Sequence, residues 1–197
     1  MMIKYSRFIG RLGGLALSIL VLLAIESCTS ESIPKPVGYY RIELPPDTFA
    51  TFASEDCPFT FHHHIMTRIQ PKREKCWYDI HFPYFKSMIQ LTYLKVEDDN
   101  LESLINDAHN LAFRHTVKAD GIKEKLFINP DDQVYGTLYN VFGNAATATQ
   151  FYLTDSSNHF IRGVVYFNAA PNEDSLRPVN EYMHKQVEIL MESLRWE

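Results

Sequence analysis

The sequence predicts an α+β domain with a mostly antiparallel sheet and two main helices. Short segments in which apolar and polar residues alternate are typical of half-buried strands, and two longer segments repeat apolar residues at helical spacing. Aromatic residues make up 13% of the 197 residues, and large flat side chains pack well on a pleated sheet. Several connections between the later segments are too short to cross over to a parallel neighbour, so antiparallel pairing is expected.

The first half of the chain contains three predicted strands followed by a helix. The strands are expected at 59–62, 77–82 and 88–96. The helix is expected to begin at Asp99, which forms a capping-box-like pattern with Glu102, and to stop at Gly121.

The second half predicts a four-stranded antiparallel meander and a last helix. Its strands are expected at 122–128, 134–142, 145–154 and 159–167, with Gly143-Asn144 as a hairpin turn. A loop at 169–177 then leads to a helix that has Pro178 in its first turn. In outline this order resembles the Mog1/PsbP-like αβα sandwich, a resemblance of topology that carries no function.

The N-terminal residues 1–27 are typical of an export signal. A basic start precedes an uncharged apolar run from Leu12 to Ile25, which is short for a membrane-spanning helix. Ser27-Cys28 follows, and a small residue before a cysteine at this place is how lipoprotein signals end. We expect Cys28 to be acylated, residues 28–37 to form a tether and residues 38–197 to form a single domain. The alternatives are an uncleaved anchor helix and a plain signal cut near Ser27.

Charge and motifs exclude several function classes. The net charge of −5 argues against nucleic-acid binding, which needs clustered Lys and Arg. The sequence contains no Gly-rich phosphate loop, Gly-x-Ser-x-Gly elbow, His-Glu-x-x-His motif or Cys-x-x-Cys pair. We therefore expect a protein that is not an enzyme and has no cofactor.

Two groups of residues could still carry chemistry. On a strand, His62 and His64 would share one face, and His81 on a neighbouring strand could complete a metal site, although exposed imidazoles at a strand end are the simpler interpretation. Residues 155–159 contain an Asp, a Ser and a His in one tight turn, where Asp and Ser normally bond the local backbone.

Cys57 and Cys76 are the two cysteines that remain after Cys28. In an exported chain they are a disulfide candidate, with separate buried thiols or a metal pair as alternatives.

A partner surface is expected where aromatic residues flank prolines. Its members are Tyr39, Tyr40, Tyr84 and Phe85, and the alternative is that these rings simply cover the edge of the sheet.

Several segments in order resemble the gliding motility-associated lipoprotein GldD family. They are 34–42, 100–108, 115–120, 134–139, 150–156, 159–163, 171–176 and 192–196. The resemblance covers essentially the whole chain after the signal. It implies a cell-envelope lipoprotein needed for gliding and associated with the type IX secretion machinery.

From the family we carry over only Cys28 as the lipid site and Cys57 and Cys76 as a structural pair. The expected partners are other gliding and secretion proteins of the envelope, and the membrane through the N-terminal lipid, at the periplasmic side of the inner or outer membrane. A periplasmic ligand-binding module, with its cleft between sheet and helix, and a metal-dependent hydrolase are the alternative functions.

Overall fold

The structure is a computed structural model that describes residues 42–97, 99–114, 119–143, 147–168 and 173–197. All of these residues belong to one compact unit of the chain. The predicted signal and most of the predicted tether lie outside the described residues. Within the described ranges, no helix is both long and apolar enough to cross a membrane.

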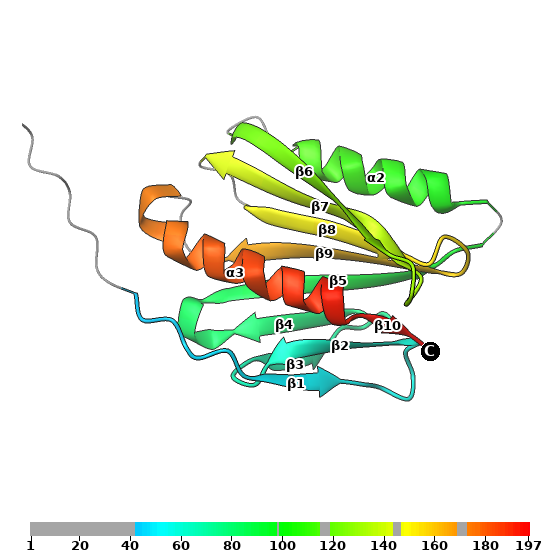
Figure 1. The fold of residues 1–197 in the computed structure, drawn as a ribbon, viewed down its shortest axis with the longest axis horizontal. Helices are drawn as coiled ribbons and strands as arrows, with labels where there is room; N and C mark the ends of the chain where they lie inside the picture. Colours follow the sequence, from blue (N-terminus) through cyan, green and yellow to red (C-terminus); the bar gives the residue numbers. More distant parts are fainter. Residues whose placement is uncertain (1–41, 98, 115–118, 144–146, 169–172) are drawn as a thin grey trace, which may run out of the picture. The chain divides into compact units, whose positions relative to one another are not determined.

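Two sheets and two helices make up the described unit (Figure 1). The elements in chain order are β1 (Phe49–Phe52), β2 (Phe59–His64), β3 (Arg68–Pro71), β4 (Tyr78–Phe82), the short 3-10 helix η1 (Pro83–Phe85), β5 (Ser87–Lys95), α2 (Leu101–Arg114), β6 (Ala119–Asn129), β7 (Val134–Gly143), β8 (Thr149–Thr154), β9 (His159–Phe167), α3 (Glu173–Ser193) and β10 (Arg195–Trp196).

The larger sheet has seven strands in the order β3-β4-β5-β9-β8-β7-β6, and the smaller one has three in the order β1-β2-β10. Every neighbouring pair is antiparallel. The α+β prediction is thus confirmed. The predicted meander is confirmed as well, because β6, β7, β8 and β9 follow one another in both sequence and space.

The seven-stranded sheet is covered on both faces, which places it between two layers. On one face Phe151 of β8 joins the main core with Met183 and Leu190 of α3. On the other face Tyr139 of β7 contacts His109 of α2, with ring centroids 6.2 Å apart. Successive side chains of a strand point to opposite faces, so α3 and α2 lie on opposite sides of the sheet. Burial raises the pKa of Tyr139 to about 12.

Close packing in the main core requires a glycine at position 163. A Cβ on Gly163 of β9 would lie 2.1 Å from Cε1 of Phe151 on the neighbouring strand. The Phe151 ring therefore occupies the space that any larger residue at position 163 would need.

Several boundaries differ from the prediction. The first long helix ends at Arg114, and Gly121 lies inside β6 at a register shift against β7, where a residue without a side chain is tolerated. The last helix begins at Glu173, so Pro178 lies inside it and not in its first turn. The apolar stripe after Pro178 packs into the core, which compensates for the one missing N–H group. Strand β8 begins at Thr149, four residues after its predicted start.

Candidate functional site

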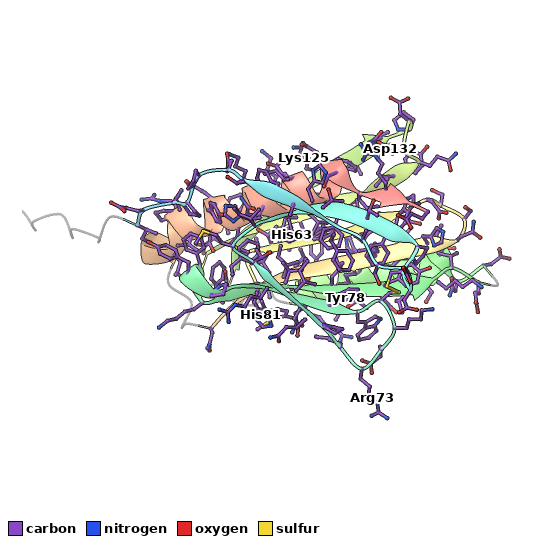
Figure 2. All side chains as sticks on the ribbon, turned by 90° about the horizontal axis from the view of Figure 1, so that it is seen from below. His63, Arg73, Tyr78, His81, Lys125 and Asp132 are labelled. Carbon is purple, nitrogen blue, oxygen red and sulfur yellow. A yellow bond between two sulfur atoms is a disulfide. The ribbon has the colours of Figure 1, made fainter. Side chains whose placement is uncertain are left out.

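The three histidines considered as metal ligands belong to two different sheets. His62 and His64 lie on β2 of the three-stranded sheet, whereas His81 lies on β4 of the seven-stranded sheet, opposite Arg68 and Met88. Figure 2 shows His63 and His81 on these separate strands. Within the described ranges, no group of three or more His, Cys, Asp or Glu side chains is placed to hold a metal ion.

His64 uses both ring nitrogens inside the protein. Its Nδ1 accepts the N–H of Met66 at 3.1 Å, so Nε2 carries the proton and donates to the carbonyl oxygen of Pro46 at 3.0 Å. The side chain is buried. His64 therefore ties the segment before β1 to the turn after β2, and this turn presents Ile65 and Met66.

The Asp155 carboxylate is occupied by its own turn. Oδ1 accepts the backbone N–H groups of Ser157 at 3.0 Å and of Asn158 and His159 at 2.8 Å. Burial alone would raise the pKa of Asp155, but these bonds and one from the Ser157 hydroxyl outweigh it and lower the pKa. The His159 ring lies 2.9 Å from the Tyr93 hydroxyl and stacks on Trp196. The turn thus uses its Asp and His for structure.

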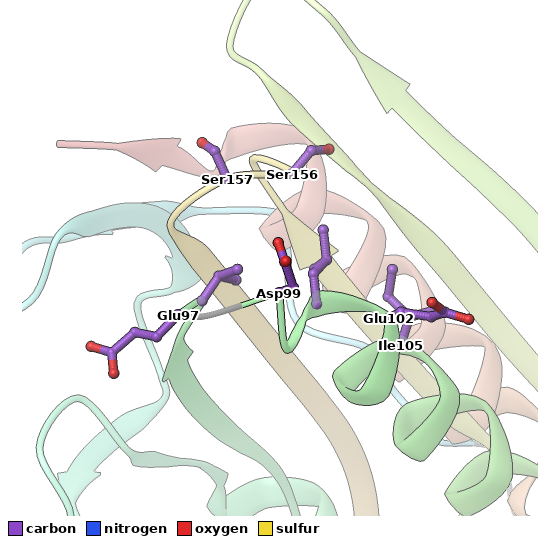
Figure 3. A pocket seen from close by; sticks show the side chains of 8 residues that line it. Glu97, Asp99, Glu102, Ile105, Ser156 and Ser157 are labelled. Atoms are coloured by element: carbon purple, nitrogen blue, oxygen red, sulfur yellow. The ribbon is translucent and has the colours of Figure 1, made fainter.

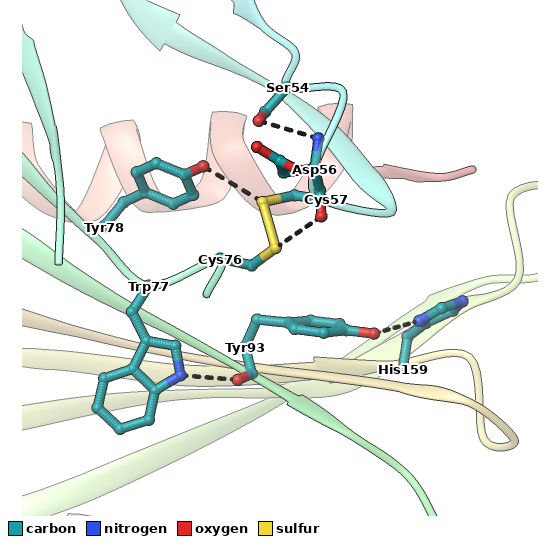
Figure 4. The surroundings of a disulfide bond; sticks show 8 residues. All are labelled: Ser54, Asp56, Cys57, Cys76, Trp77, Tyr78, Tyr93 and His159. Carbon is teal, nitrogen blue, oxygen red and sulfur yellow. Dashed lines mark hydrogen bonds between the residues drawn. A yellow bond between two sulfur atoms is a disulfide. The ribbon is translucent and has the colours of Figure 1, made fainter. Parts of the chain in front are cut away.

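Cys57 and Cys76 form a disulfide with Cα atoms 5.5 Å apart (Figure 4). Both residues are buried. The Tyr78 hydroxyl lies 3.2 Å from Sγ of Cys57, and the indole N–H of the adjacent Trp77 donates to the Tyr93 carbonyl oxygen at 2.8 Å. The bond links the segment just before β2 to the segment just before β4, so the loop that it closes contains β2 and β3.

Of the four aromatic residues predicted as a partner surface, the described part of the chain exposes one. Tyr84 is 61% exposed. Phe85 was expected beside it but packs against the core, with its ring 4.7 Å from that of Tyr182 on α3. Phe85 thus packs inward while Tyr84 faces solvent, because η1 turns adjacent side chains in different directions. Tyr39 and Tyr40 lie outside the described residues.

Tyr84 is accompanied by three exposed aliphatic side chains. Leu44 is 49% exposed, and Ile65 and Met66 are each 55% exposed. We call these four residues the Tyr84 patch. The aliphatic members were not predicted from the sequence. The Ile-Met pair directly after a polar strand end is the pattern that could have indicated them.

A buried aromatic cluster joins the two segments that carry Ile65 and Tyr84. Tyr182 lies at its centre, with its ring 6.4 Å from His64 and 4.7 Å from Phe85. His64 precedes Ile65, and Phe85 follows Tyr84. Burial, with the charge of Asp47 as a second cause, raises the pKa of Tyr182 to about 12. Its hydroxyl oxygen has no hydrogen-bond partner in the described part of the chain.

A second exposed apolar surface lies on β6, the edge strand of the larger sheet. Leu126 is 74% exposed and Ile128 is 69% exposed, and the strand alternation puts both on one face. We call them the β6 strip. On the opposite face of the strand, Lys125 donates to Glu188 of α3 at 2.8 Å.

Two depressions lie on the described surface. One, of about 240 Å³, lies between β7 and α3, and its lining combines apolar residues such as Val141 and Phe142 with polar residues such as Arg177 and Glu181. The other is an open depression of about 760 Å³ at the start of α2, lined by carboxylates and by two serines of the β8–β9 turn (Figure 3). Clefts with a mixed apolar and polar lining suit a small ligand.

Known proteins resemble this chain at two levels, a solved structure and a protein family. No curated protein matches the chain at a significant level. Among solved structures, the solution structure of cyanobacterial PsbP (CyanoP) from Synechocystis sp. PCC 6803 is similar, with 7% sequence identity and a TM-score of 0.45. The match covers 82% of this chain and 99% of that one.

The family model described as gliding motility lipoprotein GldD matches residues 29–196. A lipoprotein is held at a membrane by covalently attached acyl chains, so this description implies a membrane-anchored protein of the cell envelope. The matched range includes every described residue except Glu197. The chain belongs to the gliding motility lipoprotein GldD family.

Proposed function

We propose that this chain is a non-catalytic envelope component that supports gliding motility and the associated type IX protein secretion machinery by docking on other proteins of that machinery. The observation that carries the proposal is the family match, which spans the chain from residue 29 to residue 196.

The anchor in this proposal is an acylated Cys28, with residues 1–27 removed and the domain facing the periplasm from the inner or outer membrane. The uncharged run that ends before Ser27-Cys28 supports it. The family match supports it as well, because the matched range begins at the residue directly after Cys28.

A docking role agrees with how the chemistry-bearing side chains are used. His64 and Asp155 satisfy backbone groups, which leaves them unsuited to bind substrate. The β6 strip adds a surface of the kind that partners use, since an edge strand has unpaired backbone groups that accept a further strand.

The strand that would fit β6 has a definite chemistry. One of its faces would be apolar, to cover Leu126 and Ile128. The other would be acidic, to face the exposed Lys123 on the opposite side of β6, where Lys125 is already paired with Glu188. We therefore assign docking to an extended segment of an envelope partner with alternating apolar and acidic residues.

The test is a Leu126→Glu/Ile128→Glu double variant in a strain that depends on this protein. Both side chains are mostly exposed, so the variant should accumulate normally. We expect it to lose motility or secretion together with a co-purifying envelope partner. Glu124→Gln, on the same strand and the same face, is the matched control and should retain both. Full activity of the double variant would refute docking at β6.

A ligand-binding module is the second candidate, and the cavity between β7 and α3 favours it. If a ligand were required, Arg177→Ala and Glu181→Ala would abolish function while the β6 double variant retained it.

A metal-dependent hydrolase is the weakest candidate. It would require loss of function from a His62→Ala/His81→Ala variant together with bound metal. His64 is left unchanged in this test because its two hydrogen bonds are structural.

A further inference from the structure

We propose that the Tyr84 patch lies against the lipid bilayer that holds the acyl chains of Cys28, so that the domain contacts the membrane through a defined end. This inference rests on the proposed lipid anchor. It adds to that anchor a specific contact surface, made of Leu44, Ile65, Met66 and Tyr84.

Three separate segments bring the patch together. Leu44 belongs to the segment before β1, Ile65 and Met66 to the β2–β3 turn, and Tyr84 to η1. In Figure 1 these segments lie at the same end of the unit, opposite the end that carries the C-terminus. Exposed apolar side chains that share one end of a unit mark an interaction site more often than a single scattered one does.

Hydrogen bonds beneath the Tyr84 patch hold the backbone around Ile65 and Met66 in place. His64 bonds the Pro46 carbonyl on one side and the Met66 N–H on the other, and the Ile65 N–H donates to the Thr48 carbonyl at 3.0 Å. The exposed side chains therefore stand on a fixed base. A preformed apolar surface loses little conformational freedom when it enters the interfacial region of a bilayer.

The position of the patch along the chain favours the membrane as its occupant. Leu44 follows Cys28 by 16 positions, and a chain of that length spans at most roughly 55 Å when fully extended. The acyl anchor is therefore nearer along the chain to this end of the domain than to the C-terminal end. No other surface of the described unit is joined so closely to the predicted lipid.

The chemistry of the patch suits a bilayer interface. Leu, Ile and Met are apolar, and Tyr combines a ring with a polar hydroxyl, as is common at the headgroup level. Asp47 nearby is paired with Lys185 of α3, so it does not add an unpaired negative charge at the patch. Because the whole chain has a net charge of −5, attraction to anionic lipid does not drive the contact, and the contact should resist salt.

The test uses the acylated mature protein in phosphatidylethanolamine/phosphatidylglycerol vesicles whose acyl chains are brominated near the headgroup. A Tyr84→Trp variant carries the reporter, because bromine quenches a nearby indole. The native Trp77 and Trp196 lie at the other end and serve as internal controls. Trp196 is next to the C-terminus and stacks on His159. Trp77 lies beside the disulfide, in the same cluster as His159.

We expect the Tyr84→Trp variant to lose about half of its added emission on brominated vesicles, with little change in 1 M salt, while the wild type changes little. Adding Ile65→Asp and Met66→Asp to the variant should remove most of the quenching. An anchored Tyr84→Trp variant that is not quenched would overturn the membrane contact, and would favour a protein partner for the patch.

Failure of the anchor has a different signature. Wild-type protein that floats with vesicles only when Cys28 is intact supports the anchor whatever the quenching result. Equal flotation, or equal fatty-acid labelling, of wild type and Cys28→Ala would refute the anchor and the membrane contact with it.

Discussion

The two ends of the described unit differ in how their side chains are used. At one, which we call the closed end, side chains are cross-linked, hydrogen-bonded or stacked on one another. At the other, which we call the open end, a set of apolar side chains faces solvent. The closed end contains the Cys57–Cys76 disulfide, the Asp155 turn and the stack of His159 on Trp196. The open end contains the Tyr84 patch, whose four members are about half exposed. Both ends have packed interiors, but only the open end exposes this set of apolar side chains to solvent.

The largest expected effect at the closed end is loss of the disulfide. A Cys57→Ser/Cys76→Ser variant should lose about 3 kcal/mol of unfolding free energy, because the bond restricts the unfolded chain and both residues are buried. Urea unfolding of the oxidised wild type and the variant measures this difference. Equal midpoints would show that the closed end does not depend on its cross-link.

Trp196 makes the next largest contribution. Its ring stacks on His159 with centroids 5.1 Å apart, and its indole N–H donates to the Gln133 carbonyl oxygen at 3.1 Å. Trp196→Ala should cost about 2 kcal/mol, less than for a fully buried Trp because the ring is partly exposed. Thermal unfolding gives the value, and Trp196→Phe should recover part of it by restoring the stack without the hydrogen bond.

The closed end was partly predictable from the sequence, because its features are local or chemically distinctive. Two cysteines in an exported chain indicated the disulfide, and Asp155 in a tight turn indicated bonding to the local backbone. The meander from β6 to β9 was predicted because its turns are short. Family membership was predicted from strings spread along the chain, and the family match confirms it.

The short strands and the exposed surfaces were predicted less well because they depend on long-range packing. Strands β1, β3 and β10 have four, four and two residues, too few for alternation to identify them. Tyr84 and Phe85 are adjacent, and only the position of Tyr182 on the distant helix α3 decides which one is buried. The exposure of Leu126 follows from β6 being an edge strand, which the sequence pattern does not reveal.

The Asp155 turn should make the closed end sensitive to acid. The pKa of Asp155 in the folded state is lowered, so its stabilisation is complete above the ordinary carboxyl pKa and is lost as the pH falls through the folded-state value. Asp155→Asn should cost about 1 kcal/mol at neutral pH, since three charged hydrogen bonds are weakened by solvent screening.

The pH dependence separates this carboxylate from general acid unfolding. The difference in unfolding free energy between wild type and Asp155→Asn should stay constant from neutral pH to about pH 4 and shrink below it. Chemical denaturation at several pH values measures it. A difference that grows on acidification would contradict the lowered pKa.

The smallest effect on stability is expected at the open end, from an Ile65→Asn/Met66→Asn double variant. More than half of each side chain already faces water, so the substitutions remove little buried apolar area. The backbone bonds of the turn, from the Ile65 N–H to Thr48 and from the Met66 N–H to His64, do not involve either side chain. The unfolding free energy should therefore change by less than about 0.5 kcal/mol. If the patch contacts lipid, the same variant should be less protected from hydrogen exchange in this turn on vesicles, while the Asp155 turn exchanges as in the wild type. A loss of stability comparable to that of Trp196→Ala would show that Ile65 and Met66 belong to the core, and would remove the contrast between the two ends.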